Sequence, residues 1–127
     1  MADAFFKANA ERDGVVSLSS GFQYRIVTPG SGRLAQPGNK LNVRYAGLML
    51  NGVIFAETYT TQQPVIVDID RIAPQWREVL LKMREGVEFE VYLPPAHPAT
   101  NVFEINGISP NEPVIYLVRL LHVVDFG

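Results

Sequence analysis

Apolar and polar residues alternate along much of the chain, which is the pattern of β-strands that bury one face. Strands are predicted on this basis at residues 22–26, 41–50, 65–69 and 87–93, with a return strand beginning at 53–55 and a final strand at 114–124. The dipeptide Asn51-Gly52 follows the second strand. It predicts a type I′ hairpin turn, because both central residues of that turn need positive φ. The pattern therefore predicts an antiparallel sheet of five or six strands.

One segment has helical spacing instead. Its apolar residues recur at positions i, i+3, i+4 and i+7, which places them on one face of a helix. These residues are Trp76, Val79, Leu80 and Met83. Pro74 is suited to the first turn of that helix and Gly86 to its end. A sheet with one central helix packed against it is an α+β fold.

The start of the chain predicts a second, short helix. Residues 3–12 carry apolar side chains at helical spacing, and Gly14 can adopt the left-handed conformation that ends a helix. A helix of this length rarely holds alone, so we expect it to dock on the domain or to be the end of a longer segment. The chain is therefore divided into an N-terminal helical segment, residues 1–14, and one domain, residues 15–127.

A long connection joins the last two strands. Residues 94–113 contain five prolines in 20 residues and show no clear period. Loops of that length in compact domains are usually functional or disordered. The loop also contains Val102, Phe103, Ile105 and Ile108. These apolar side chains predict that it folds over something.

The composition narrows the function. The 127 residues make one ordinary domain, and 11 basic against 13 acidic residues leave no basic excess for holding nucleic acid. No apolar run approaches the ~20 residues that cross a bilayer. The chain does not open with a signal-peptide pattern, so the cytoplasm and the periplasm both stay open as compartments. There is no cysteine, and His97 and His122 are the two histidines, so we expect no metal and no cofactor.

Motifs for nucleophiles, phosphate loops and metal hydrolases are missing from the sequence. The aromatic residues at mostly inward-facing positions carry more information, and they are Tyr45, Phe55, Trp76, Phe89 and Tyr116. Each ring also suits an ordinary hydrophobic core, and this alternative stays open. Trp76, however, lies in the first turn of the predicted helix beside the long loop, where a tryptophan more often forms the floor of a cavity. An aromatic cavity without acid, base or metal suits rotation about the peptide bond before proline.

Several motifs resemble one family over essentially the whole chain. Residues 43–55, VRYAGLMLNGVIF, resemble the V-x-Y-x-G-x-L-x-x-G-x-x-F signature of FKBP-type peptidyl-prolyl cis-trans isomerases, with Met49 at the leucine position. Residues 72–76 resemble the family's V-I-x-G-W motif at the helix start, and residues 108–121 resemble its I-P-P-N ending. Residues 5–24 are similar to the bacterial macrophage infectivity potentiator group. The resemblance implies a half-barrel sheet wrapped around the central helix.

The same resemblance implies a peptidyl-prolyl cis-trans isomerase that acts on proline-containing polypeptides. The implied catalytic residues are Tyr45, Phe55 and Trp76, and the implied substrate-binding residues are Val65, Ile72, Ala73, Ile108 and Tyr116. In this assignment Trp76 lies under the proline ring. The backbone N–H of Ala73 donates to the substrate carbonyl, and the hydroxyl of Tyr45 lies near the rotating amide. The similarity to the macrophage infectivity potentiator group also implies a dimer formed through the N-terminal segment.

Four positions depart from the family's pattern. Ala56 stands where aspartate is usual and Ala99 where tyrosine is usual, while Val65 replaces an aromatic residue and Tyr116 a phenylalanine. These departures predict reduced activity and only weak binding of tacrolimus- or rapamycin-type ligands. The alternative function is a peptide-binding or chaperone module that keeps the fold and has lost catalysis.

Overall fold

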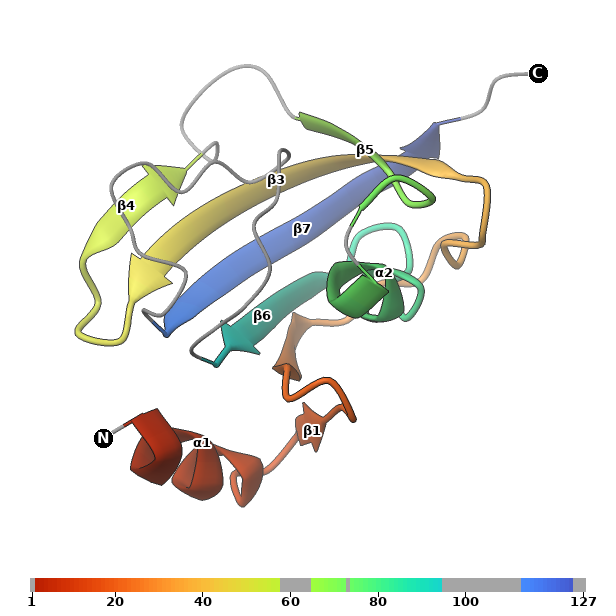
Figure 1. Ribbon diagram of the computed structural model, residues 1–127. Coiled ribbons are helices and arrows are strands. Elements are labelled where there is room, and N and C mark those ends of the chain that lie inside the picture. The colour runs from red at the N-terminus through yellow and green to blue at the C-terminus, as the bar shows by residue number, and fades with distance from the viewer. Residues whose placement is uncertain (1, 58–64, 73, 95–112, 125–127) are drawn as a thin grey trace.

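The computed structural model describes residues 2–57, 65–72, 74–94 and 113–124, and for residues 2–3 and 54–57 it describes the backbone (Figure 1). The helices are α1 (Ala2–Ala10) and α2 (Pro74–Leu80). The strands are β1 (Val15–Ser17), β2 (Gln23–Thr28), β3 (Lys40–Met49), β4 (Ile54–Glu57), β5 (Val65–Asp68), β6 (Glu88–Leu93) and β7 (Val114–Val124). Neither helix is long and apolar enough to cross a membrane, a finding that covers the described residues.

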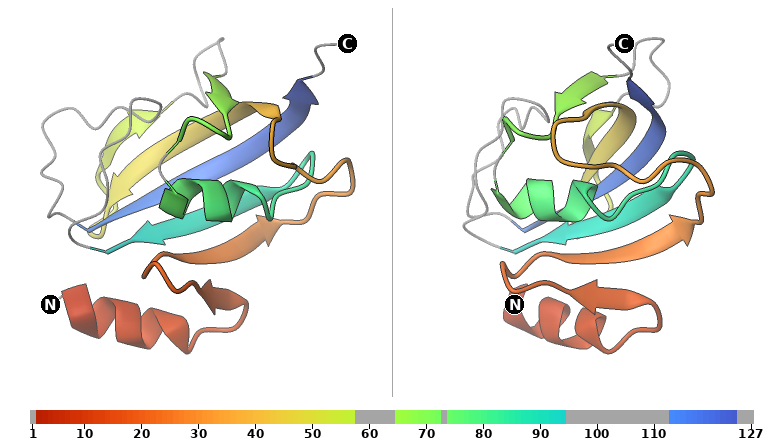
Figure 2. Two further views of the ribbon diagram at one scale, coloured as in Figure 1. Left: turned by 45° about the vertical axis from the view of Figure 1, so that its right-hand side comes forward. Right: turned by 90° about the vertical axis from the view of Figure 1, so that its right-hand side faces the viewer.

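The strands form one antiparallel sheet in the order β1-β2-β6-β7-β3-β4. The strand β5 pairs with residues 40–43 of β3, and β4 pairs with residues 46–48 on the same edge. The described part of the sheet is therefore six strands wide although it has seven strands. It curves around α2, which lies on its concave side (Figure 2). The predicted α+β half-barrel around one central helix is confirmed.

The hydrophobic core lies between α2 and the concave face of the sheet. Side chains alternate along a strand, so every second residue of the long central strands faces the helix. In one row across the sheet, Phe89, Val118 and Tyr45 are register partners, and all three are buried. From the helix, Trp76 and Leu80 have no exposed surface. The helical spacing in the sequence therefore identifies the core face of α2 correctly.

The helix α2 is shorter than its spacing predicts. It ends at Leu80 rather than at Gly86. Single turns follow, in which the N–H of Lys82 donates to the carbonyl of Val79 and the N–H of Met83 to that of Leu80. Met83 is nevertheless fully buried, so it fills the core from a turn. Gly86, with φ of 92°, belongs to the connection that leads into β6.

The hairpin between β3 and β4 is confirmed, but the predicted type I′ turn centred on Asn51-Gly52 is wrong. The N–H of Gly52 donates to the carbonyl of Met49 at 2.8 Å, so the central residues of the turn are Leu50 and Asn51. Gly52 follows with φ of 91°. A three-residue loop that ends in a left-handed glycine is the next most common hairpin connection after the two-residue loop. In it Asn51 is the second central residue of the turn, and Gly52 is the left-handed residue that follows.

The N-terminal helix α1 docks on the outer face of the sheet. Docking on the domain is one of the two arrangements that the sequence predicts for this helix. The side-chain amide of Asn9 donates to Oε1 of Gln23 at 2.8 Å, and Nε2 of Gln23 donates to the carbonyl of Phe6 at 2.9 Å. These bonds satisfy two polar side chains that are almost fully buried. Phe5 contacts Tyr92 of β6 at a ring-centroid distance of 6.1 Å. Tyr92 alternates with the core residues of β6, so α1 lies on the face opposite α2.

Glu85 connects three segments of the chain. Its carboxylate accepts hydrogen bonds from the N–H of Val123 at 2.7 Å and from the N–H and Nη2 of Arg33, both at 3.1 Å. The segment with Arg33 runs so close that a Cβ on Gly32 would lie 2.5 Å from Cβ of Glu85. The bond from Val123 and then those from Arg33 lower the pKa of Glu85 from 4.5 to about 2. The ionised carboxylate therefore stabilises the folded state.

The substitution Glu85→Gln is expected to lower the free energy of unfolding by about 1–3 kcal/mol near neutral pH, because charge-assisted hydrogen bonds are lost. Folding lowers the pKa of this group, so its contribution is complete above the ordinary value of 4.5 and disappears as the pH falls toward 2. Urea unfolding at several pH values measures the difference, with the exposed Glu11→Gln as control. A difference that stays constant down to about pH 2 contradicts this role.

Candidate active site

Four aromatic rings form a continuous group between α2 and the concave face of the sheet. Trp76 contacts Phe22 at a ring-centroid distance of 5.7 Å and Tyr116 of β7 at 5.4 Å, both edge to face. Tyr116 contacts Tyr45 of β3 at 6.2 Å. We call these four residues the aromatic cluster. It joins a turn, a helix and two strands that are far apart in the sequence.

The register of β3 and β7 places the two tyrosines of the cluster in neighbouring rows. Tyr45 lies opposite Val118, and Tyr116 lies opposite Gly47. Since Gly47 has no side chain, the ring of Tyr116 has no bulky cross-strand neighbour on β3. This arrangement leaves room for Tyr45 and Tyr116 to approach one another diagonally. The glycine of the sequence motif thus has a packing role beside the cluster.

The cluster is apolar in character but carries phenol groups. Tyr116 is fully buried, and 7% of Tyr45 is exposed. Burial raises the pKa of Tyr116, and the neighbouring Tyr45 adds to this shift. The phenol of Tyr116 therefore stays protonated at physiological pH. The site offers hydroxyl dipoles to a ligand rather than an ionised group from these two residues.

Trp76 lies in the first turn of α2, as its position after Pro74 predicts. Its side chain has no exposed surface, so it is a core residue in this structure. A ligand can meet the face of the indole only after a neighbouring side chain moves aside. The long loop beside which a cavity above Trp76 is expected spans residues 94–113, and residues 95–112 of it lie outside the described residues. The cavity therefore stays a prediction.

Of the expected substrate-binding residues, Ile72 and Val65 pack with the same core. Ile72 lies between β5 and α2 and is 8% exposed, and Val65 of β5 is half-buried beside the cluster of buried residues. Val65 is the register partner of Val43. Ala73 and Ile108 lie outside the described residues, and so does Ala99. Their assigned roles stay predictions.

The backbone of β4 is irregular at Phe55. Gly47 pairs with Ala56, and Leu48 pairs with Ile54, so Phe55 is the extra residue between two register partners. Such bulges bend a strand and occur often beside active sites. Ala56, where the family usually has aspartate, occupies the same row as Gly47 and Tyr116. Ala56, which lacks the family's carboxylate, and Tyr116, which adds a phenol hydroxyl where the family has phenylalanine, thus lie in one row of the sheet.

Sequence reasoning missed the part that Phe22 takes in the site. The residue is almost fully buried, with 1% exposed, and its ring meets Trp76 edge to face. Its alternation with Gln23 predicted an inward-facing side chain, but no local signal connects residue 22 with residue 76. The contact depends on how β2 and α2 meet, which only the folded chain determines.

The described residues offer binding and desolvation rather than proton transfer or metal chemistry. Within the described ranges, no group of three or more His, Asp or Glu side chains could hold a metal ion. The aromatic cluster has apolar surfaces and phenol hydroxyls, which suit an apolar ring joined to a polar amide. A prolyl peptide has this combination. The arrangement therefore favours recognition of a proline-containing segment.

Comparison with known proteins agrees with this interpretation. Residues 31–121 match the family model of FKBP-type peptidyl-prolyl cis-trans isomerases. The chain is 32% identical over 120 residues to peptidyl-prolyl cis-trans isomerase Mip of Coxiella burnetii, covering 94% of this chain and 52% of that protein. It is 34% identical over 122 residues to outer membrane protein MIP of Legionella longbeachae, covering 95% and 52%. The chain thus spans about half the length of these curated relatives.

Solved structures share the fold. The crystal structure of FkpA from Escherichia coli has a TM-score of 0.79 at 25% sequence identity, over 96% of this chain and 57% of that one. A peptidyl-prolyl cis-trans isomerase from Pseudomonas syringae has a TM-score of 0.75 at 23% identity, over 98% and 91%. At 23% identity, the similarity to the Pseudomonas syringae structure shows a shared fold alone.

Trp76 is the single tryptophan of the chain, so tryptophan fluorescence reports on this site alone. A peptide with one proline is expected to change the emission of Trp76, because the side chains around the buried indole must rearrange to admit the ring. The same peptide with alanine in place of proline is the control and should leave the emission unchanged. Binding measured by calorimetry without any change in emission contradicts the placement of Trp76 at the site.

Proposed function

This chain belongs to the family of FKBP-type peptidyl-prolyl cis-trans isomerases, and on this premise we propose that it catalyses rotation about the peptide bond before proline in polypeptides. In the cell this activity would assist protein folding. The aromatic cluster is the observation that carries the proposal: Tyr45, Tyr116 and Trp76 form one chain of ring contacts inside the half-barrel. The proposed rotation needs no metal and no cofactor.

An apolar site can catalyse this rotation without an acid or a base. Partial double-bond character gives the amide a barrier of about 18–20 kcal/mol, and rotation without a catalyst takes tens to hundreds of seconds. The planar amide is more polar than the twisted amide, so removing water destabilises the planar form more. A site that fits the twisted amide also binds it more tightly, and this difference in binding lowers the barrier.

We assign the proline ring to the face of Trp76 and the rotating amide to the neighbourhood of the Tyr45 hydroxyl. The N–H of Ala73 would donate to the substrate carbonyl. The remaining contacts would come from Phe55, Val65, Ile72, Ile108 and Tyr116. Because Trp76 is fully buried in the free protein, substrate binding would include a movement of the side chains around it. Burial of the proline ring would compensate for the surface that this movement opens.

The activity would be lower than that of a family member with the usual residues. Ala56 and Ala99 cannot make the hydrogen bonds of the aspartate and the tyrosine that they replace. Each lost hydrogen bond costs about 0.5–1.5 kcal/mol, and about 1.4 kcal/mol corresponds to a factor of ten in rate. Two losses would therefore slow catalysis by roughly ten- to a hundredfold. Tacrolimus- and rapamycin-type ligands would bind weakly for the same reason.

The N-terminal segment would also form a dimer contact. The docked helix α1 leaves Ala4, Lys7 and Ala8 exposed on its outer side. Sedimentation of the chain tests this contact, and Ala8→Glu is expected to weaken it by placing a charge in the interface. A monomer at high protein concentration contradicts this dimer contact.

We keep the bacterial cytoplasm or periplasm as the proposed compartment.

Two substitutions restore residues that the family usually carries, Ala56→Asp and Ala99→Tyr. Each is expected to raise kcat/KM several-fold, because a carboxylate near Tyr45 and a phenol at the loop position add hydrogen bonds in the site. The free energy of unfolding should change by less than ~1 kcal/mol. Gains at the two sites need not add, since both act on one bound amide.

The measurement is the refolding of a protein whose slow phase is limited by proline isomerisation, with thermal melts of every variant. Gln36→Glu, at an exposed position in the connection between β2 and β3, is the control for an added carboxylate. If the wild type leaves the slow phase unchanged, the proposed catalysis is wrong. A folded double variant that binds peptide but isomerises no faster than the wild type supports the peptide-binding module instead.

A further inference from the structure

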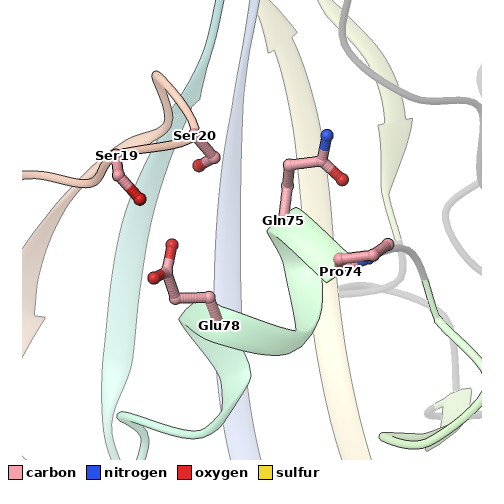
Figure 3. Close-up of a pocket in the computed structure, with 5 residues that line it drawn as sticks. All are labelled: Ser19, Ser20, Pro74, Gln75 and Glu78. Atoms are coloured by element: carbon pink, nitrogen blue, oxygen red, sulfur yellow. The ribbon is translucent and has the colours of Figure 1, made fainter.

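A pocket of about 340 Å³ lies between the turn that joins β1 to β2 and the first turns of α2 (Figure 3). It is lined by Ser19, Ser20, Pro74, Gln75 and Glu78. Figure 3 shows the carboxylate of Glu78 and the hydroxyl of Ser19 turned toward one another across the pocket. None of these residues has a role in the proposed catalytic assignment. We call this cavity the Glu78 pocket.

Both walls of the Glu78 pocket continue into the aromatic cluster. Gln75 directly precedes Trp76 on α2. On the other wall, the N–H of Phe22 donates to Oγ of Ser20 at 3.3 Å, and the rings of Phe22 and Trp76 are in contact. The pocket is therefore adjacent to the candidate active site. Because the two sites share the contact between Phe22 and Trp76, a peptide with its proline at Trp76 would pass the pocket with residues near the proline, each advancing about 3.3–3.6 Å in an extended chain.

The chemistry of the Glu78 pocket suits a cation with hydrogen-bond donors. Glu78 is the one ionisable side chain among its five lining residues, and it is half-buried. Its neighbour Arg77 pairs with Asp70 at 3.6 Å. No lysine or arginine in the described part of the chain lies within 4.0 Å of the Glu78 carboxylate. The hydroxyls of Ser19 and Ser20 add further acceptors.

The geometry points to an extended substrate subsite: we propose that the Glu78 pocket binds a lysine or arginine side chain that lies about two or three residues from the proline of the substrate. This inference rests on the proposed function. It makes Glu78 a residue that determines specificity for polypeptides with a basic residue near proline. The attraction would act on binding of the substrate rather than on rotation of the amide, because the charge lies away from the reacting bond.

The test compares peptides that contain one proline and carry lysine, glutamine or glutamate at the second or third residue on either side of it. Calorimetry gives Kd, and a refolding or peptide assay gives kcat/KM. For at least one position, the wild type is expected to bind the lysine peptide roughly two- to fivefold more tightly than the glutamine peptide at low salt. High salt should reduce this ratio, because exposed charges are screened.

Three variants identify the source of the preference. Glu78→Gln should bring the ratio of lysine to glutamine peptide close to one, and Glu78→Lys should reverse the preference toward the glutamate peptide. Glu11→Gln, an exposed carboxylate on another part of the chain, is the matched control and should keep the wild-type ratio. Thermal melts verify that each variant is folded.

The outcomes separate this inference from the proposed function. Equal Kd values for lysine and glutamine peptides at every position, or a lysine preference that survives Glu78→Gln, overturn the assignment of the pocket, while isomerisation of the neutral peptide still supports the proposed function. A lysine preference in Kd that depends on Glu78, without catalysis, supports the pocket and contradicts the proposed catalysis. If none of the peptides binds, both are overturned.

Discussion

The fold depends on one short helix that fills the concavity of a wide, curved sheet. The helix α2 has seven residues, and of the two described helices it is the one on the concave face (Figure 2). So short a helix buries few side chains, so those that it does bury must be large or closely packed. Trp76 is the largest of the fully buried side chains, and it spans the distance from Phe22 to Tyr116. The main core residue is therefore also the centre of the candidate active site.

This overlap connects catalysis with burial. Removal of water from apolar surface stabilises the core, and under the proposed function the same dry surroundings would disfavour the polar, planar amide of a bound prolyl bond. They also disfavour ionisation, which is why the phenol of Tyr116 has a raised pKa. A free protein with its indole fully buried keeps this environment closed to water. The energetic requirement for the proposed activity would then be local, because a proline ring would have to replace the side-chain contacts that it displaces.

The sequence predicts those parts of the fold and site that follow from local periodicity. The long strands β3, β6 and β7 alternate regularly, so their inward-facing residues were identified correctly, Tyr45 and Tyr116 among them. The family motif adds their proximity to Trp76. Periodicity is weaker evidence where a polar residue is buried or an apolar one is not. Gln23 is buried because α1 satisfies its amide, whereas Ile26 is 50% exposed despite its inward-facing spacing.

What the sequence could not predict depends on contacts between distant segments. The end of α2 at Leu80 and the turn at Gly52 are decided by which carbonyls the N–H groups reach in the folded chain. The Glu78 pocket is a stronger case, because neither wall has a motif of its own. Ser20 is held there by the N–H of Phe22, and Glu78 by the helix that positions Trp76. Because its two walls are attached to Phe22 and to the helix of Trp76, the pocket keeps a constant position relative to the contact between these two rings. The core pair to which we assign the proline ring would thereby also set the distance at which a flanking residue is recognised.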